Sequence, residues 1–430
     1  MKERLLEWLQ ALKTKRPGKW LFFAFILSFF LTFPLSLRCQ KNSCIECHKE
    51  LDEELRAPVD ASQKDIHFQF GLGCQDCHGG NPLEDDAELA KDKSFKGAPK
   101  RAQIPDFCAS CHSNSAYMRR FNPNIRVDQL ELYWTSQHGQ LLRKGDKNVA
   151  VCTDCHGVHG IQASNFPKSS TFAWNIPQTC GRCHSSQEYM KAYGIPINQE
   201  DEYKESVHVK ALFEKKDLSA PVCNDCHGNH GASPPEVASI AFVCRQCHPS
   251  AGDLFARSPH KAAFDSLDMS ECEACHGNHK ILAPSDEMLA GGRHDVCSQC
   301  HDARTKPYDA GVRMKQELES YVSSFQSAQD VLARAEKQGV DISEPRFKLQ
   351  EASTALILVR NLTHGLSVSD MQGKLKEGDK IIEEVKALGE AALEEAKFRK
   401  TGLVVATVFI FLLALALYLK IKQLEKKPPV

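Results

Sequence analysis

The amino-acid sequence predicts a fold that is mostly helical and irregular, with a transmembrane helix near each end. Three observations lead to this prediction. The middle of the chain has few long apolar runs and repeats one short cysteine motif nine times. The segment from about 308 to 400 has no cysteine, and its apolar residues recur at helical spacing. Two apolar runs, one near each end, are long enough to span a bilayer.

The composition is dominated by cysteine and histidine. The chain has 430 residues, 19 cysteines, 18 histidines and a formal net charge of −1. A nucleic-acid-binding domain would carry a basic patch, so nucleic acid is not an expected partner. Because aliphatic residues are sparse in the middle of the chain, we expect the core there to be built from something else.

Eighteen of the 19 cysteines fall into nine copies of Cys-x-x-Cys-His, and Cys39 is left over. The copies are Cys44/Cys47/His48, Cys74/Cys77/His78, Cys108/Cys111/His112, Cys152/Cys155/His156, Cys180/Cys183/His184, Cys223/Cys226/His227, Cys244/Cys247/His248, Cys272/Cys275/His276 and Cys297/Cys300/His301.

This motif is the attachment signature of c-type haem. Two cysteines one helical turn apart can form thioethers to the porphyrin, and the next histidine becomes the proximal iron ligand. Zinc sites pair Cys-x-x-Cys units but do not require a histidine after each. Disulfide pairing gives no reason for the same three-residue spacing in every copy. The sequence therefore predicts nine covalently bound haem c groups in a haem-cored domain over residues 38–307.

The N-terminal apolar run covers residues 20–37 and follows a basic segment, 1–19. This pattern suits a signal peptide or a signal anchor. No small-x-small cleavage site follows the run, so an uncleaved anchor is favoured. Cys39 could suggest lipidation, but Arg38 before it does not fit a lipoprotein site.

The second apolar run covers residues 402–419, and a basic tail, 420–430, follows it. A buried core helix is the alternative to a membrane span. Cytoplasmic flanks carry excess Lys and Arg, so both termini are predicted to be cytoplasmic. The haem domain then lies on the periplasmic side of the cytoplasmic membrane, which is also where haem is attached to c-type cytochromes.

The motifs form an internal repeat of four dihaem modules. Three modules read Ser-x-His, then Cys-x-x-Cys-His-Gly-x-His, then a second Cys-x-x-Cys-His, and they begin at Ser136, Ser206 and Ser258. A weaker copy begins near His67 and has Asn81 in place of the extra histidine. The motif at Cys44 stands alone before the first module.

Nine histidines lie outside the motifs, which equals the number of distal ligands that nine bis-histidine haems would need. The candidate distal ligands are His67, His138, His159, His208, His230, His260, His279, His294 and His364. Six of them recur at repeat positions, whereas His364 lies in a helical segment with no motif around it. Met118 and Met190 could also ligate iron, although packing is the simpler role.

Residues 308–400 are predicted to form three helices, about 310–338, 346–364 and 370–400. We expect a helical stalk that docks on the haem domain and leads into the membrane. The alternative is that this helical segment forms part of a haem pocket and contributes His364 to it.

Successive attachment sites are only 21 to 44 residues apart, so the porphyrins must lie close together. Covalent haem with two histidine ligands favours electron transfer, because no coordination position is free. No catalytic residue is predicted.

The repeated modules over residues 40–301 resemble those of multihaem cytochromes c from anaerobically respiring bacteria. The N-terminal anchor followed by a haem motif resembles the membrane-bound quinol dehydrogenases of nitrate and nitrite respiration. The chain departs from the latter in its nine motifs, its C-terminal span and the lack of a methionine soon after Cys44. These resemblances imply a role in anaerobic respiration.

Two functions follow as expectations. The first is an electron conduit from a membrane quinol pool or membrane oxidoreductase to a periplasmic partner such as another cytochrome. The second is a reductase of a small nitrogen or sulfur oxyanion at an open haem. A catalytic multihaem nitrite reductase often has Lys in place of His in one motif, and none of the nine motifs here does.

Overall fold

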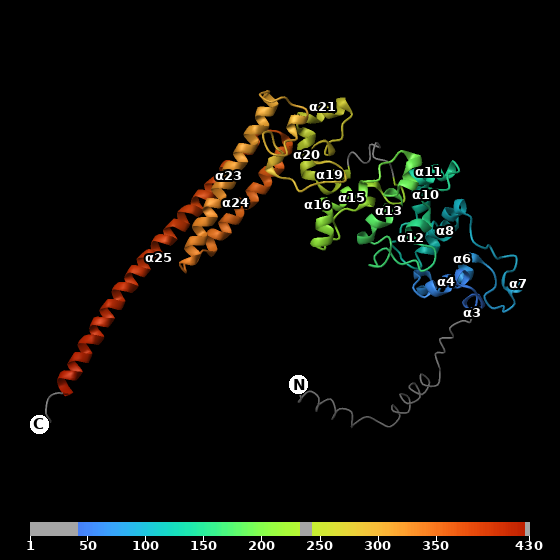
Figure 1. Cartoon of the computed structure of the whole chain (residues 1–430), viewed down its shortest axis with the longest axis horizontal. Coiled ribbons are helices and arrows are strands. Elements are labelled where there is room, and N and C mark those ends of the chain that lie inside the picture. Colours follow the sequence, from blue (N-terminus) through green and yellow to red (C-terminus); the bar gives the residue numbers. More distant parts are fainter. Residues whose placement is uncertain (1–41, 233–242, 426–430) are drawn as a thin grey trace, which may run out of the picture. The chain divides into compact units, whose positions relative to one another are not determined.

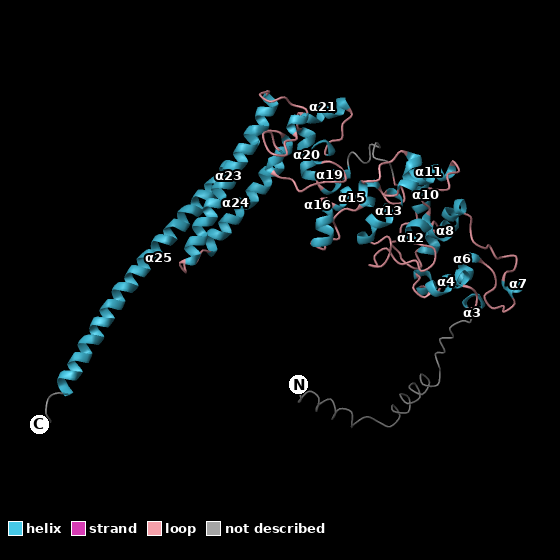
Figure 2. Ribbon diagram, viewed as in Figure 1, coloured by secondary structure: helices cyan, strands magenta, loops and turns pink. Residues whose placement is uncertain are grey.

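The computed structural model describes residues 42–232 and 243–425. Within these ranges the chain forms helices joined by loops and contains no strand (Figure 2). This agrees with the predicted fold class. The predicted N-terminal span, 20–37, lies outside the described residues.

The chain divides into two compact units. Unit 1 comprises residues 1–100 and 158–161, and unit 2 comprises residues 101–157 and 162–430. The helices described in unit 1 are α3 (Ser43–Lys49), α4 (Glu53–Ser62), α5 (Ile66–Gln69), α6 (Cys74–His78) and α7 (Ala87–Ala90).

The motif-bearing part of unit 2 consists of short helices and long loops. Its elements are η2 (Arg101–Gln103), α8 (Ile104–His112), α9 (Ser115–Met118), α10 (Gln129–Thr135), α11 (Gln137–Arg143), α12 (Cys152–His156), η3 (Ala173–Asn175), α13 (Ile176–His184), α14 (Gln187–Met190), η4 (Lys191–Tyr193), α15 (Gln199–Lys204), α16 (Val207–Val209), η5 (Lys210–Glu214), α17 (Cys223–His227), α19 (Val243–Cys247), α20 (Pro249–Arg257), α21 (His260–Leu267), α22 (Glu273–His276), η6 (Asp286–Met288) and η7 (Cys297–Gln299).

Three long helices follow and lie side by side (Figure 1): α23 (Lys306–Lys337), α24 (Ser343–Leu362) and α25 (Val368–Glu425). The one-turn helix η8 (Thr363–Gly365) joins α24 to α25. The sequence predicts three helices here and the structure has three. It differs in one respect, because α25 runs without a break through the predicted stalk and the predicted span. No proline interrupts this stretch, so nothing in the backbone chemistry ends the helix near residue 400.

The three-helix bundle contains the largest apolar core among the described residues. Met314, Leu318 and Tyr321 are almost fully buried. The Tyr321 hydroxyl donates a 2.8 Å hydrogen bond to the Ala352 carbonyl and so ties α23 to α24. At Gly378 of α25, an added Cβ would lie 2.2 Å from that hydroxyl. Glycine is therefore required there for α25 to approach α23.

Outside the bundle, the described apolar clusters are small. One consists of Tyr133, Leu142, Val149 and Val151, and another contains Leu212, Ala220 and Val222. Clusters of this size do not provide a continuous aliphatic core for the motif-bearing part. This fits a core that is completed by bound groups.

The C-terminal part of α25 is apolar and wholly exposed. Side chains such as Leu403, Phe409 and Leu413 are more than 60% accessible. The most apolar window of α25 has a mean hydropathy of 2.7, and the helix is long enough to cross a membrane. Large exposed apolar surfaces of this kind mark interaction sites rather than free solvent-facing helices.

Candidate haem-binding sites

The motif at the start of each module has a common local structure. It forms a helix of four or five residues ending at the motif histidine, as in α6, α12, α17 and α22. A glycine with positive φ follows in each case, at Gly79, Gly157, Gly228 and Gly277. Left-handed backbone suits glycine, so these residues end the helix and turn the chain sharply. We call these four the glycine-terminated motifs (Cys74, Cys152, Cys223 and Cys272).

An aspartate inside three of these motifs fixes the start of the helix. Asp76, Asp154 and Asp225 accept hydrogen bonds of 2.7 to 2.8 Å from the backbone N–H of the residue before the first cysteine. Such bonds satisfy an N–H that would otherwise lack a partner at a helix start. The Cys-x-Asp-Cys-His-Gly sequence therefore specifies its own turn.

The other five motifs, at Cys44, Cys108, Cys180, Cys244 and Cys297, have no glycine after the histidine. We call them the non-glycine motifs. In α8 and α13 the helix begins with Ile-Pro and ends with an ordinary right-handed residue. Helix α3, at Cys44, ends in the same way at Glu50, with φ −92° and ψ −1°. A further helix then follows, which is α9, α14 or α4 respectively.

The main feature of the site is a series of facing histidine rings. Seven pairs have ring centres 5.8 to 6.5 Å apart: His78–His159, His138–His184, His156–His230, His208–His248, His227–His279, His260–His301 and His276–His364. Each pair joins one motif histidine to one of the nine others. Direct ring stacking would bring the centres closer, so each pair leaves a gap.

The gap has the size of a metal with two axial imidazoles. A metal–imidazole bond of about 2 Å on each side, plus ~1 Å from nitrogen to ring centre, places the rings about 6 Å apart. The residues present therefore fit a haem iron with the motif histidine on one side and the second histidine on the other.

The extra histidine after a glycine-terminated motif faces the preceding module. His159 faces His78, His230 faces His156, and His279 faces His227. Each module thus contributes a histidine to a site in the module before it.

The Ser-x-His histidines instead face the second motif of their own module. His138 faces His184, His208 faces His248, and His260 faces His301. His67 holds the same place in the first module. Every non-glycine motif of these three modules is therefore paired with a histidine 40 to 46 residues upstream.

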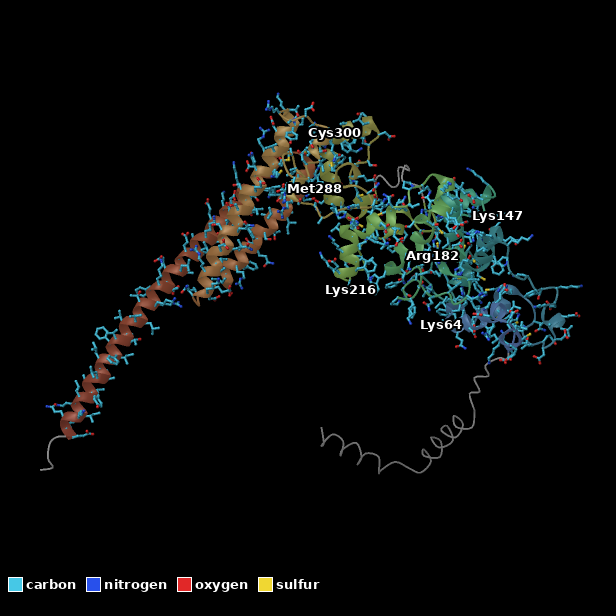
Figure 3. All side chains as sticks on the ribbon, in the orientation of Figure 1. Lys64, Lys147, Arg182, Lys216, Met288 and Cys300 are labelled. Carbon is cyan, nitrogen blue, oxygen red and sulfur yellow. The ribbon has the colours of Figure 1, made fainter. Side chains whose placement is uncertain are left out.

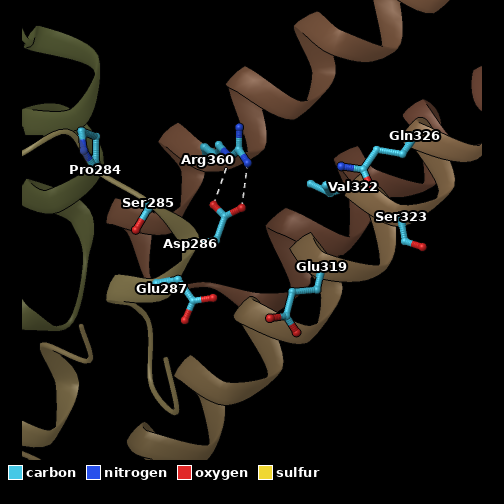
Figure 4. Close-up of a pocket in the computed structure, with 9 residues that line it drawn as sticks. All are labelled: Pro284, Ser285, Asp286, Glu287, Glu319, Val322, Ser323, Gln326 and Arg360. Atoms are coloured by element: carbon cyan, nitrogen blue, oxygen red, sulfur yellow. Dashed lines mark hydrogen bonds and ion pairs between the residues drawn. The ribbon is translucent and has the colours of Figure 1, made fainter. Parts of the chain in front are cut away.

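His364 takes the place of the extra histidine that a fifth module would provide. It lies in η8 of the bundle and faces His276 at 6.1 Å. Asn361 donates a 2.5 Å hydrogen bond to Ser250, and Arg360 pairs with Asp286 through bonds of 3.0 and 2.7 Å. Figure 4 shows the Arg360–Asp286 pair in a pocket between η6, α23 and α24. These contacts hold His364 against the last glycine-terminated motif.

Hydrogen bonds at Nδ1 orient several of these rings. His78 Nδ1 lies 3.0 Å from the Gly97 carbonyl, and His364 Nδ1 lies 2.9 Å from the Asn361 carbonyl. A carbonyl only accepts, so Nδ1 carries the hydrogen and Nε2 is free to face a metal. His67 Nδ1 lies 2.8 Å from the Asp65 carboxylate, which orients it in the same way.

Burial keeps many of these imidazoles neutral. It lowers the pKa of His138 and His184, and it lowers the pKa of His156 to about 4. A protonated imidazole has no lone pair for a metal. These three rings are therefore ready for coordination at neutral pH.

The Ser-x-His segments are fixed by buried serines at their start. Ser136, Ser206 and Ser258 are no more than 6% exposed, and the hydroxyl of each accepts a backbone N–H of the helix that follows it. Asp65 is equally buried and accepts the His67 N–H at 2.9 Å. Asp65 is thus the counterpart of the serines in the first module.

A repeated backbone hydrogen bond links each cap to the following module. The N–H of Ile66 donates to Ile161, that of Gln137 to Ala232 and that of Val207 to Ile281, at 2.7 to 3.1 Å. The acceptor always lies two residues after the extra histidine. In the last module the donor position is Pro259, which has no N–H. The link is therefore lost where no further module follows.

Replacing Ser206 with Ala is expected to destabilise the protein. The change removes the acceptor for the Val209 N–H at a fully buried helix start, which costs about 0.5–2 kcal/mol for such a cap. Urea unfolding followed by haem absorbance measures the effect. Ser219→Ala is the control, because the Ser219 hydroxyl bonds only to Asp217 at the surface; an equal loss in both variants would contradict the prediction.

Cysteine contacts show which attachment sites are neighbours. The side chain of Cys152 lies close to that of Cys108, that of Cys180 close to that of Cys223, and that of Cys272 close to that of Cys244. In unit 1, burial raises the pKa of the Cys74 thiol, and the nearby Cys44 raises it further. Each of these contacts joins a non-glycine motif to the next glycine-terminated motif.

Three second cysteines provide the remaining links in unit 2. Burial raises the pKa of Cys155, with a contribution from nearby Cys183. Burial raises the pKa of Cys226 to about 11, with a contribution from nearby Cys244. Burial likewise raises the pKa of Cys275, with a contribution from Cys297. Arg182, in the middle of the motif-bearing part (Figure 3), donates a 2.5 Å bond to the Asp154 carbonyl and ties α13 to α12. The seven sites of unit 2 thus follow one another in chain order.

The second cysteines of the first module, Cys77 and Cys111, are placed by their helices. Cys77 lies one turn after Cys74 in α6 and is exposed, and its proximity adds to the rise that burial causes in the pKa of Cys74. Cys111 lies one turn after Cys108 in α8 and is half-buried. These positions do not test thioether formation, so haem attachment at Cys77 and Cys111 stays a prediction. The same holds for the second cysteines Cys47, Cys155, Cys183, Cys247 and Cys300.

The remaining candidates are placed differently. His294 is exposed, and within the described residues no histidine ring faces it. Its neighbour Cys297 belongs to a motif whose histidine already faces His260. Met118 and Met190 are 8% and 6% exposed and lie in apolar surroundings.

The amino-acid sequence does not assign any distal histidine to a particular motif. The repeat does show which histidines are equivalent to one another. It does not show that the Ser-x-His histidines pair within their own module, whereas the histidines after the glycine-terminated motifs pair with the preceding module.

Residues 66–185 match the family model for cytochrome c3. The match covers the first two modules, from His67 to His184. It supports a multihaem electron-transfer cytochrome with covalently bound haem c. No curated protein and no solved structure gives a significant match.

Proposed function

We propose that this chain is a membrane-anchored nonahaem cytochrome c that conducts electrons on the periplasmic side of the cytoplasmic membrane. The observation that carries the proposal is the set of seven histidine pairs with ring centres about 6 Å apart. Haem c, when bound, supplies a one-electron couple at each site.

The ligand set favours electron transfer over substrate chemistry. Two histidines fill both axial positions of a site, so no position is left for a substrate. By this rule His138, His208 and His260 serve non-glycine motifs, and His67 is proposed as a distal ligand because it holds the equivalent place in the repeat. His159, His230, His279 and His364 serve the glycine-terminated ones.

The order of the sites favours conduction along a row. In unit 2 each site has a cysteine near a cysteine of the next site, from Cys108 to Cys297. In unit 1 Cys44 and Cys74 are neighbours in the same way. Such a row lets a donor and an acceptor bind at different places.

The membrane role rests on α25 and on the N-terminal apolar run. The exposed apolar part of α25 is followed by Lys420 and Lys422, which suits a cytoplasmic flank. We infer that the donor is a quinol pool or a membrane oxidoreductase and that the acceptor is a periplasmic redox protein such as another cytochrome.

Interrupting the row tests conduction. Cys223→Ala with Cys226→Ala removes the middle site of unit 2, so electrons added at substoichiometric amounts should remain in two separate populations. Flash photoreduction followed by haem absorbance measures this redistribution. The matched control removes an end site, with Cys297→Ala and Cys300→Ala, and leaves one population. Equal behaviour of both variants would contradict a row.

The haem number is measured in the same preparations. Mass spectrometry of the intact wild-type protein is expected to show nine covalent haems, and each double variant should show eight. A smaller wild-type number would contradict the nonahaem proposal directly.

A further inference from the structure

We propose that the haem at Cys44 has no protein histidine on its distal side and binds a small neutral ligand from solution there. The inference rests on the proposed haem attachment at Cys44 and goes beyond it. It follows from the position of this motif in the repeat.

The Cys44 motif has the structure of a non-glycine motif. Helix α3 continues past His48 to Lys49 and ends at the right-handed residue Glu50, and α4 follows. Cys44 is the neighbour of Cys74, just as Cys108 is the neighbour of Cys152. The Cys44 motif therefore corresponds to the second half of a module whose first half is missing.

A non-glycine motif takes its second histidine from upstream in its own module. In three modules the distance along the chain is 40 to 46 residues. For His48 this interval falls on residues 2–8, and no histidine occurs anywhere before His48. The interval that supplies the second histidine in the other modules therefore contains none for the half-module at Cys44.

Asn81 also supports the interpretation that the Cys44 motif is the second half of an incomplete module. The extra histidine of a module faces the glycine-terminated motif of the preceding module. No glycine-terminated motif precedes the first module, so a histidine at position 81 would have nothing to face. The Asn81 side chain instead accepts the Leu83 N–H at 3.1 Å and shapes a local turn.

Leu83 lies at the position where the first module would accept a backbone hydrogen bond from a preceding module. Its counterparts Ile161, Ala232 and Ile281 accept the backbone bond from the preceding module. Among the described residues no donor reaches the Leu83 carbonyl, and its side chain is 68% exposed. The repeat thus begins here, and the half-module at Cys44 has no upstream partner in the described chain.

The surroundings of His48 contain neither common axial ligand. The His48 Nδ1 lies 3.3 Å from the Leu55 carbonyl, which leaves Nε2 for iron. Within the described part of unit 1 no histidine ring faces His48, and no methionine occurs in residues 42–100 or 158–161. An iron with only one strong protein ligand accepts small neutral ligands, whereas a bis-histidine iron does not.

Carbon monoxide binding to the dithionite-reduced, full-length protein in detergent tests the inference. We expect one CO per protein in the wild type and none in the variant with Cys44→Ala and Cys47→Ala. The control with Cys297→Ala and Cys300→Ala lacks the other terminal haem and should still bind one CO. His159→Ala, which opens the neighbouring site at Cys74, should raise the number from one to two.

Electron paramagnetic resonance of the oxidised protein gives a second readout, with one high-spin haem expected in the wild type and none without the Cys44 haem.

Nine low-spin haems and no bound CO would overturn the inference while leaving the proposed function intact. CO binding that survives removal of the Cys44 haem would overturn it too. So would CO binding that appears only with Cys39→Ser, because a thiolate would then fill the position. A wild-type count of eight haems would instead show that the proposed attachment is wrong.

Discussion

Replacing His364 with Ala is expected to convert one low-spin haem per protein into a high-spin haem. His364 faces His276 at 6.1 Å, and its Nδ1 hydrogen bond to the Asn361 carbonyl points Nε2 toward the gap. Loss of this ring leaves the site at Cys272 with one axial ligand. Low-temperature electron paramagnetic resonance of the oxidised protein measures the change.

The matched control for this prediction is His294→Ala. His294 is exposed, and no histidine ring faces it among the described residues, so its loss should leave the number of high-spin haems unchanged. A spectrum of His364→Ala that equals the wild type would show that η8 does not supply a ligand.

The His364 variant should also loosen the contact between the bundle and the last module. Arg360 and Asn361 would remain as the polar contacts to Asp286 and Ser250, and partly exposed contacts of this kind contribute little. Hydrogen exchange should therefore become faster in η8 and in the end of α24, while the middle of α23 keeps its protection.

Replacing Leu318 with Ala is expected to lower the free energy of opening of the bundle by about 2–5 kcal/mol, the usual cost of truncating a fully buried leucine. Leu318 is 0% exposed and lies between Met314 and Tyr321 in the core of α23. Hydrogen exchange of the α23–α25 amides in the full-length protein measures the loss.

Leu358→Ala on α24 is the control for Leu318→Ala. The Leu358 side chain is 52% exposed, so its truncation is expected to change stability by no more than about 0.5 kcal/mol. Similar effects in both variants would mean that the bundle is not held by the described core.

Both predictions concern the bundle, in which Leu318 lies on α23 and His364 lies in η8 between α24 and α25. His364 lies four residues before α25, and α25 continues without interruption into its exposed apolar part. A turn at Leu366, whose φ is 53°, separates η8 from α25, so this short segment joins a distal ligand to a candidate membrane helix. The proposed anchor and the last haem sites of the row are coupled through this segment.

The amino-acid sequence by itself determined the local chemistry. Cys-x-x-Cys-His specifies covalent attachment and one axial ligand within five residues, so no long-range contact is needed to recognise it. Helical spacing similarly predicted three helices after the last motif, because each amphipathic face is a local pattern. The sequence did not predict that α25 continues past residue 400, because the stalk and the span differ in pattern, one amphipathic and the other wholly apolar.

The pairing of ligands was decided only by the tertiary structure. His159 lies three residues after His156, yet it faces His78 of the preceding module. Because a porphyrin separates its two axial ligands, a histidine so close to the proximal one stays on the same side of its own ring and must serve another site. Which site that is depends on how the backbone links of Ile66, Gln137 and Val207 join successive modules. The bundle residue His364 completes the series because folding brings it to His276, and no spacing along the chain shows that.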